Sequence, residues 1–506
     1  MNNIKVLFIN PNPRNMSLVP PVVSLFYSIF KESNIDMKFF DTTFYDLSSH
    51  YTNPDSFRQE SLEVRPYEVE LIKKRTQFKK GVDVYPDFRS MVESWQPDVI
   101  MASAMESTIT FTIELLRSIR GLHVPTVLGG VFATFVPEMA IDFDEVDIVC
   151  IGEGESVIVP LCKRLASGKK VSGIPNLWVK EDSGNVLKSP LIPPVDINKN
   201  PRFDASIIDD SRFYRAMAGK IYKMFPVETH RGCPCKCTFC NSPLQSEKYK
   251  EESGAKYFRK KSVERVLEDI YYFVEECQAE YFFFWADNFL SYSKKEIDGF
   301  CEAYTDIKIP FYIQSYPSTI DEHKIKRLCK VGLDRIGIGI EHGNENFRRK
   351  VIKRVYSNEM AINGVKILKK HGVQFSCNNI VGFPTETPEL HMDTVKLNHI
   401  LKPHSAGCSI FTPFHGTPLR ELAIKLGYLK DPDFIAPTNT EESILEMPNF
   451  SKEEIIAKSL VFNFYIKFPK NRWRNIKRAE AMTPEGAKIR SELREEYLAK
   501  YCDENY

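Results

Sequence analysis

Five short apolar runs, separated by polar turns and helical patterns, dominate the first 160 residues of the chain. The runs cover residues 5–10, 37–41, 98–103, 126–130 and 147–152, and a helical pattern covers residues 22–31. Strands of continuous apolar residues separated by helices are typical of a parallel sheet that is covered on both faces. The pattern therefore predicts an α/β domain over residues 1–160 with a flavodoxin-like, doubly wound parallel sheet.

Polar residues and glycines stand where these predicted strands end. In open parallel sheets, ligands bind beyond the carboxyl ends of the strands. The sequence thus predicts one binding crevice, and its expected lining is Asn10, Ser103, Gly129, Gly130, Gly152 and Glu153.

The alternation weakens over residues 161–220. Prolines interrupt this stretch at Pro175, Pro190, Pro193, Pro194 and Pro201, and residues 176–179 form a predicted small strand. We interpret the stretch as a linker between two domains.

A second alternation of strands and helices covers residues 221–430. Strands are predicted at 226–230, 281–285, 311–315, 335–340, 375–380 and 408–412, and helices at 262–277, 293–305, 321–331, 357–371 and 387–401. Ser262 and Ser357 are expected N-caps. Six βα units make a partial barrel, open where eight units would close, and the reactive residues of such barrels lie at the carboxyl ends of the strands.

Residues 431–506 change character again. Pro432, Pro437 and Pro448 break the pattern, and helical periodicity then covers residues 452–468 and 484–501, which predicts a mainly helical C-terminal region. A basic cluster surrounds Trp473 and comprises Lys467, Lys470, Arg472, Arg474, Lys477 and Arg478. It fits either a solvated helix face or a patch for an anionic substrate or nucleic acid.

Composition narrows the class of protein. The chain has 506 residues, enough for two or three domains, and its 43% hydrophobic and 27% charged residues are typical of a soluble globular protein. A net charge of +1 provides no overall field for nucleic acid or an acidic membrane. We expect neither a membrane span nor a signal peptide. The cysteines outside one cluster stand singly, which fits a reducing cytoplasm.

That cluster holds four of the twelve cysteines within eight residues: Cys233, Cys235, Cys237 and Cys240. Cys233, Cys237 and Cys240 form C-x3-C-x2-C, which supplies three thiolate ligands to a [4Fe-4S] cluster and leaves one iron open. Two alternatives are a structural zinc on all four cysteines and reduced thiols without metal. Zinc sites normally draw two separated cysteine pairs, and no second C-x2-C follows here.

The motif, with its R-G-C-P lead-in and the aromatic residue before the last cysteine, resembles the radical S-adenosylmethionine (SAM) superfamily. The resemblance implies that Cys233, Cys237 and Cys240 are the cluster ligands and that Phe239 packs near the adenine of SAM. In that superfamily the open iron binds SAM, whose reductive cleavage releases a 5′-deoxyadenosyl radical. Cys235 departs from the pattern, since an aromatic residue is usual at its position.

The same resemblance implies further SAM contacts at later strand ends. Asp287 and Asn288 would contact the SAM amino group, Glu341 the ribose and Arg354 the carboxylate, while Gln314 and Asn379 would point into the barrel mouth and Phe383 would lie in the adenine-side loop. Each has a structural alternative: Asp287 as a cap, Glu341 in an ion pair with Arg335 or Arg348, and Arg354 in solvent. His342, His404 and His415 are read as packing or substrate contacts.

Residues 128–138 and 151–155 resemble segments of the cobalamin-binding domains that are fused to radical SAM enzymes. The implied cobalamin contacts are Asn10, Ser103, Gly129, Gly130, Phe132 and Glu153, with the two glycines allowing close approach of the dimethylbenzimidazole tail. Phe132 stands where a histidine is common, and residues 10–14 lack the D-x-H-x-x-G motif, so no side chain of that loop should ligate the cobalt. The alternative is a flavodoxin-like domain that has lost its ligand.

Together the two resemblances imply a cobalamin-dependent radical SAM methyltransferase acting on an unactivated carbon. The alternatives are a cobalamin-associated radical SAM cyclase or rearrangement enzyme and a non-catalytic, metal-stabilised binding protein. Methylthiotransferases carry further N-terminal cluster cysteines, whereas the first 220 residues hold only Cys150 and Cys162. Expected partners are a small-molecule or peptide substrate and an electron donor such as flavodoxin or ferredoxin, without nucleic acid.

Overall fold

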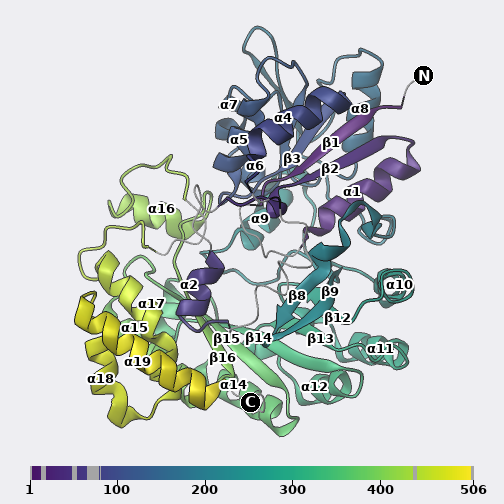
Figure 1. Cartoon of the computed structure of the whole chain (residues 1–506). Helices are drawn as coiled ribbons and strands as arrows, with labels where there is room; N and C mark the ends of the chain where they lie inside the picture. The colour runs from purple at the N-terminus through teal and green to yellow at the C-terminus, as the bar shows by residue number, and fades with distance from the viewer. Residues whose placement is uncertain are drawn as a thin grey trace.

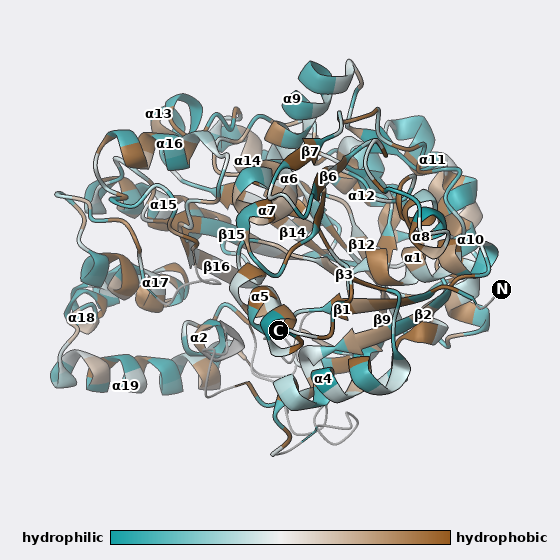
Figure 2. Cartoon of the chain, turned by 90° about the horizontal axis from the view of Figure 1, so that it is seen from above, coloured by the Kyte–Doolittle hydropathy of each residue, from teal (hydrophilic) through white to brown (hydrophobic). Residues whose placement is uncertain are grey.

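Two seven-stranded sheets organise the chain, one in each half (Figure 1). The computed structural model describes residues 3–12, 19–47, 54–64, 79, 81–436 and 442–502. The hydrophobic residues concentrate in the sheets and on the inner faces of the surrounding helices (Figure 2).

The N-terminal sheet has the doubly wound order that the apolar runs predicted. Its parallel strands follow the order β2-β1-β3-β4-β5, formed by β1 (Lys5–Asn10), β2 (Asp36–Asp41), β3 (Val99–Ser103), β4 (Thr126–Gly129) and β5 (Ile148–Cys150). Antiparallel strands β6 (Leu177–Lys180) and β7 (Val186–Lys188) extend the sheet beyond β5. The chain reverses between β1 and β3, which places the ligand crevice there.

Alternate residues of β1 serve the two faces of this sheet, because successive side chains of a strand point to opposite sides. Val6 and Phe8 pack with one hydrophobic cluster, and Leu7 and Ile9 pack with the other. Helices α1 (Pro21–Glu32) and α8 (Ile158–Ala166) belong to the first cluster, whereas α4 (Val84–Trp95), α5 (Ile109–Ser118), α6 (Val131–Phe135) and α7 (Pro137–Asp142) belong to the second.

The second sheet is the predicted partial barrel. Six parallel strands follow each other in chain order: β9 (Lys220–Glu228), β12 (Tyr281–Trp285), β13 (Phe311–Ser315), β14 (Leu333–Glu341), β15 (Gln374–Val381) and β16 (Ser405–Ile410). The helices between them are α9 (Asn241–Ser253), α10 (Val263–Glu275), α11 (Lys294–Tyr304), α12 (Glu322–Cys329), α13 (Glu345–Lys350), α14 (Asn358–Lys370) and α15 (Pro388–Leu401). Both expected N-caps are confirmed, because the side chains of Ser262 and Ser357 accept hydrogen bonds from the third helical residue.

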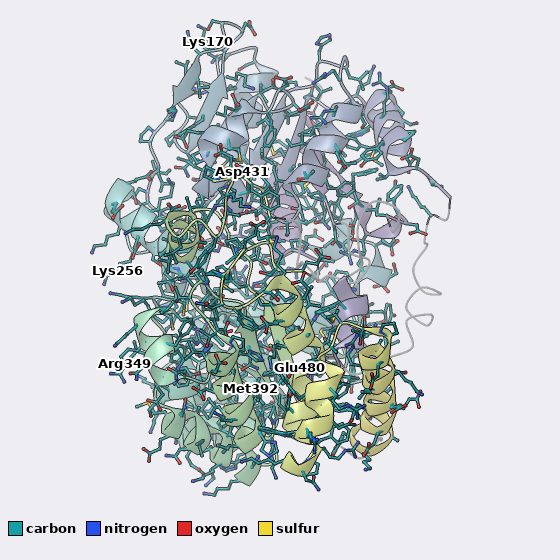
Figure 3. The ribbon with its side chains drawn as sticks, turned by 90° about the vertical axis from the view of Figure 1, so that its left-hand side faces the viewer. Lys170, Lys256, Arg349, Met392, Asp431 and Glu480 are labelled. Carbon is teal, nitrogen blue, oxygen red and sulfur yellow. The ribbon has the colours of Figure 1, made fainter. Side chains whose placement is uncertain are left out.

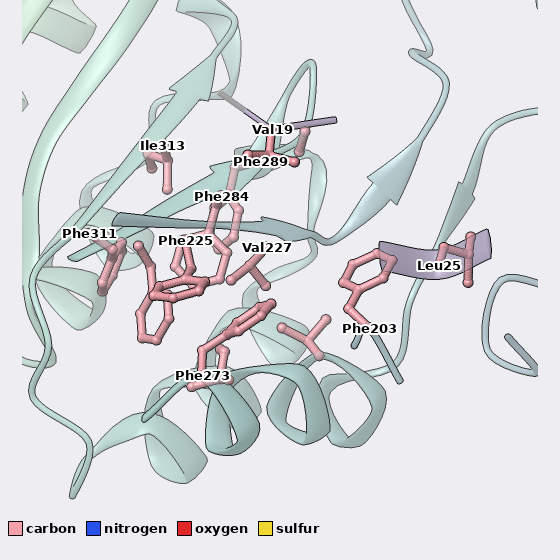
Figure 4. Close-up of a cluster of buried hydrophobic side chains, with 14 of the residues drawn as sticks. Val19, Leu25, Phe203, Phe225, Val227, Phe273, Phe284, Phe289, Phe311 and Ile313 are labelled. Atoms are coloured by element: carbon pink, nitrogen blue, oxygen red, sulfur yellow. The ribbon is translucent and has the colours of Figure 1, made fainter. Parts of the chain in front are cut away.

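Residues 161–220 contain more regular structure than a linker requires. Strands β6 and β7 join the N-terminal sheet, and β8 (Tyr214–Met217) pairs with β9 at the edge of the barrel sheet. A core shared by the two halves includes Leu25, Phe203, Val227 and Phe273 (Figure 4). The division at residues 160, 220 and 430 stays a prediction.

The C-terminal region is helical as expected, with α17 (Lys452–Lys467), α18 (Trp473–Ala479) and α19 (Pro484–Tyr501), whereas α16 (Pro418–Lys425) precedes it within residues 221–430. Helix α17 covers β16, since Ser459 donates a 2.6 Å hydrogen bond to the Cys408 carbonyl and Asn463 a 2.7 Å hydrogen bond to the Ala406 carbonyl. Half of the basic cluster is paired within the tail, through Arg472–Glu496, Lys477–Glu480 and Arg478–Glu485. This pairing favours the structural reading of that cluster.

Helix α2 (Pro54–Glu60) leaves the N-terminal domain and lies against the open side of the barrel, beside the C-terminal helices (Figure 1). The residues after it make the contact: Leu62 is buried in the hydrophobic cluster of α17, and Asn463 donates to the Ser61 carbonyl at 3.0 Å. The N-terminal domain therefore supplies part of the barrel wall. Within the described residues, no helix combines the length and apolar character needed to cross a bilayer.

Gly130 offers a test of the N-terminal crevice. Its φ is +95°, and an added Cβ would lie 2.5 Å from the Ala104 carbonyl oxygen. We expect Gly130→Ala to lower the free energy of unfolding by about 2 kcal/mol in chemical denaturation. Gly299→Ala is the matched control, because Gly299 lies inside α11 with open space around it, and alanine there should add about 0.5–1 kcal/mol. Equal stability of the two variants would contradict this account.

Candidate active site

The cysteine loop follows β9 and the short strand β10 (His230–Arg231), at the carboxyl end of the barrel strands. Gly232 enters the loop with φ +86°, where an added Cβ would lie 2.8 Å from the Tyr257 ring. Thr238 anchors the middle of the loop, because its N–H and hydroxyl donate to the carbonyls of Ile352 (3.0 Å) and Val351 (2.7 Å). The loop is therefore held against the segment that follows β14.

Two of the three expected cluster ligands already have N–H donors on their sulfur atoms. Arg354 Nη1 lies 3.3 Å from Cys237 Sγ, and the Ser242 N–H lies 3.5 Å from Cys240 Sγ. Burial raises the pKa of Cys240 to about 12 and raises that of Cys237, which the Arg354 guanidinium opposes. Hydrogen bonds to sulfur stabilise cluster thiolates, so this donor set suits an iron–sulfur cluster.

Cys235 behaves differently from the three motif cysteines. A hydrogen bond with Cys233 lowers the pKa of Cys235 and raises that of Cys233. Across the part of the chain that the structure describes, no three His, Cys, Asp or Glu side chains converge closely enough to hold a metal ion. The assignment of Cys233, Cys237 and Cys240 stays a proposal.

Arg354 joins the cysteine loop to β14. Besides Cys237, its guanidinium donates twice to the Gly339 carbonyl (3.1 and 2.6 Å) and stacks over the Tyr316 ring at 4.2 Å. Glu341 Oε1 lies 3.7 Å from Arg354 Nη2. Burial disfavours the charged guanidinium and so lowers the pKa of Arg354, but Glu341 and Cys237 outweigh this effect and raise it. The guanidinium thus holds protein groups at the expected SAM carboxylate site.

Glu341 ends β14 in an unusual conformation. Its φ is +64°, and the pairing with β15 shifts register between Gly339 and Glu341. Burial raises the pKa of Glu341, while Arg354 lowers it. The irregular strand end turns this carboxyl into the barrel cavity, where Gln314 also lies. The expected partner Arg335 instead pairs with Asp334, and Arg348 donates to backbone carbonyls.

Asp287 and Asn288, which follow β12 closely, have different roles. Asp287 accepts a 3.0 Å hydrogen bond from Ser242, next to Cys240, and burial raises its pKa. Asn288 is buried, and its amide oxygen accepts from Ser315 (2.8 Å) and Thr319 (3.0 Å). Asn288 therefore holds the strand ends together, whereas Asp287 lies beside the cysteine loop.

Phe239 and Phe383, the expected adenine neighbours, lie together with ring centroids 5.8 Å apart. The Phe383 loop is fixed by Glu386, whose carboxylate accepts from the N–H groups of Gly382 (2.7 Å) and Phe383 (3.0 Å). Burial would raise the pKa of Glu386, but the nearby His342 and His391 rings, with nitrogens 3.3 and 3.8 Å from its carboxylate, lower that pKa to about 2. This buried trio was not predicted, because His342 is distant in sequence from Glu386 and His391.

A cavity of about 760 Å³ runs along the inner face of the barrel. It includes both Arg335 and Glu341, at opposite ends of β14, so it extends for about 20 Å along the strand direction. Strand residues Gln314, Asn378 and Ser409 contribute neutral polar groups. Asn379, expected at the mouth, also lines this cavity, and its largely buried amide donates to the Gly407 carbonyl at 2.9 Å.

Residues 58–64, which comprise the end of α2 and the turn that follows it, form another wall of this cavity. Arg58 and Glu63 line it and pair with each other at 2.9 Å. Glu63 packs so closely on β16 that a Cβ on Gly407 would lie 2.9 Å from its carboxyl carbon. No sequence pattern predicted this contact, since nothing local links residues 58–64 to the barrel.

A second cavity, of about 340 Å³, lies at the carboxyl edge of the N-terminal sheet. Of the six expected cobalamin contacts it brings together Ser103, Gly129, Gly130 and Glu153, among apolar side chains that include Phe8, Phe26 and Trp285. An added Cβ at Gly129 would make ordinary 3.8 Å contacts, so the room there is free for a ligand, whereas Gly130 is required by the protein itself. The apolar, glycine-edged crevice suits the tail of cobalamin.

The other two expected contacts are used by the protein. The amide of Asn10 donates to Asp41 at 3.1 Å. Phe132 is buried edge-on against the His415 ring, with centroids 6.0 Å apart. Pro13 and Arg14, at the end of the 10–14 loop that lacks the D-x-H-x-x-G motif, lie outside the described residues.

Buried ions connect this crevice to the cysteine loop. Arg231, two residues before Cys233, pairs with Glu153, Glu155 and Glu228, and Arg259 pairs with Glu153. The Arg231 and Lys261 cations offset burial and lower the pKa of Glu228 to about 2.

Helix α9 (Asn241–Ser253), directly after the loop, reinforces this connection. Its Tyr249 is fully buried in the N-terminal core and accepts a 2.8 Å hydrogen bond from the Glu153 N–H. Sequence reading missed α9, which has a polar, weakly periodic sequence.

Comparison with known proteins agrees with these two sites. The model of the Radical SAM superfamily matches residues 227–397, and that of the B12 binding domain matches residues 59–161. An uncharacterised methyltransferase of Pyrococcus horikoshii is 28% identical over 391 residues, which are 76% of this chain and 82% of the relative. An anaerobic magnesium-protoporphyrin IX monomethyl ester cyclase of Cereibacter sphaeroides is 24% identical over 340 residues, 64% of this chain and 53% of the relative.

Among solved structures, the radical S-adenosylmethionine methyltransferase TsrM from Kitasatospora setae, with tryptophan substrate and a SAM analogue bound, superposes with a TM-score of 0.65. The likeness covers 92% of this chain and 84% of TsrM at 15% identity, and it concerns the fold. The cysteine motif, the barrel, the crevice and both family models agree. The chain therefore belongs to the radical SAM enzymes that carry a B12-binding domain.

Proposed function

We propose that this protein is a cobalamin-dependent radical SAM methyltransferase that methylates an unactivated carbon. The observation that carries the proposal is the buried contact between Arg231 of the cysteine loop and Glu153 of the crevice. It would hold the two proposed cofactor sites on either side of one interface. When bound, the cluster supplies the electron that cleaves SAM, and cobalamin supplies the methyl group.

The residues of the chain position these groups. Cys233, Cys237 and Cys240 would hold the cluster, with Arg354 orienting Cys237 through the 3.3 Å contact. Glu341 and Asp287 present carboxyl groups on the SAM side, and Glu386 fixes the loop of Phe383. Ser103, Gly129 and Glu153 would line the cobalamin site.

The barrel cavity is the proposed substrate site. Its length and its neutral polar wall suit a small molecule or peptide with hydrogen-bonding groups. An electron donor such as flavodoxin or ferredoxin would reduce the enzyme in the cytoplasm. Because a relative is named as a cyclase, cyclisation without methyl transfer is the second candidate.

Products separate the two candidates. Anaerobic incubation of the cluster- and cobalamin-loaded enzyme with SAM, a reductant and cell extract should yield both 5′-deoxyadenosine and S-adenosylhomocysteine, because methyl transfer consumes SAM in both ways. Liquid chromatography with mass detection measures the two products. Formation of 5′-deoxyadenosine alone would favour cyclisation, and formation of neither would refute the proposal.

The ligand assignment has its own test. After anaerobic reconstitution, the Cys237→Ala variant should contain about tenfold less iron than the wild type and should lose the visible absorbance of the cluster, because a thiolate ligand is missing. Cys235→Ala is the matched control in the same loop and should retain about four iron atoms per chain. Iron and sulfide analysis measures both variants. Loss of iron from the Cys235 variant would overturn the assignment.

A further inference from the structure

A surface groove of about 550 Å³ lies beside the cysteine loop and reaches Tyr316, the ring that stacks with Arg354. Cys235 and Cys237 form part of its floor. The start of α9, with Pro243 and Leu244, makes one wall, and Lys353 and Val355 make another. The groove shares no lining residue with the barrel cavity or the crevice.

Hydrogen bonds fix the walls of this groove to its floor. Thr238 donates to the carbonyls of Val351 and Ile352, just before Lys353. On another side, the Leu419 N–H donates to the Thr238 carbonyl at 3.2 Å. A partner that binds here would therefore contact a preformed surface attached directly to two cysteines.

The surface around the groove is positively charged. Lys236 and Lys353 line it, and Arg349 and Lys350 precede its wall at the end of α13; all four are exposed. Within the described residues none of the four forms an ion pair. Glu247 is the opposing carboxylate in the lining.

An apolar contact point accompanies these charges. The Val355 side chain is 67% exposed at the wall. Unpaired cations around an exposed apolar residue are typical of a transient docking surface for an anionic protein.

We propose that this groove, with Lys236, Arg349, Lys350, Lys353 and Val355, is the docking surface for a small acidic electron-carrier protein of the flavodoxin type. The inference rests on the proposed function, which requires a one-electron donor. In the step concerned, the reduced flavin of the carrier loses one electron and the metal cluster gains it, and no covalent bond changes. The basic rim steers the acidic carrier, and the floor brings it over the cysteine loop.

The test uses the cluster-loaded enzyme and a purified flavodoxin. Charge reversal in the double variant Arg349→Glu with Lys350→Glu should weaken flavodoxin binding about tenfold at low salt, as measured by biolayer interferometry, and should reduce its salt dependence. A second variant, Lys353→Glu, should act in the same direction. The matched control reverses Lys169 and Lys170, two neighbouring exposed lysines of which Lys170 lies at the far end of the N-terminal domain (Figure 3), and should bind as the wild type does.

A second readout separates this inference from the proposed function. The ratio of 5′-deoxyadenosine formed with reduced flavodoxin to that formed with dithionite should fall at least fivefold in the double variant. An unchanged affinity and ratio would overturn the docking surface while leaving the enzyme a radical SAM catalyst. No product with either reductant in the wild type would refute the proposed function instead. Loss of binding to transfer RNA with flavodoxin affinity unchanged would make the groove a nucleic-acid site and contradict the inference.

Discussion

The buried ion network around Arg231 is the constraint on which the rest of the active site depends. One guanidinium meets three carboxylates, two from the N-terminal domain and one from β9, and Arg259 shares Glu153. Burying charges is costly unless each is paired, and removing one partner leaves an uncompensated charge. The domains can therefore separate or rotate only by exposing or unpairing these ions. The network thereby fixes the cysteine loop relative to the crevice.

The substrate space is built by parts of the chain that are distant in sequence. The barrel supplies neutral polar strand residues, while the segment after α2 and the C-terminal helix close the open side. A six-stranded barrel has an open edge, and an uncovered edge and apolar interior would attract other chains. Covering that side both stabilises the barrel and gives the enzyme a variable wall. Arg58 and Glu63 are the charged groups on that wall.

Local patterns accounted for most elements and for the location of the chemistry. Strands β1, β12 and β13 and helix α19 begin and end where periodicity predicted them, because each has continuous apolar or clearly capped sequence. Residue-level roles were less predictable. Asn288 and Asn379 satisfy buried backbone and side-chain groups, and Gly130 is required by its own backbone. A predicted strand end gives the position of a residue in the fold, but it does not predict the hydrogen-bond partners of the side chain.

The two sheets, the cysteine motif and the glycine-edged crevice could be predicted from local patterns. They depend on residue spacing and on the alternation of apolar residues along continuous segments. Three contacts follow only from the folded structure. Arg231 pairs with Glu153, Tyr249 packs in the N-terminal core, and residues 58–64 line the barrel cavity. These contacts join residues up to hundreds of positions apart. Their energies come from burial and charge pairing, which no local pattern encodes.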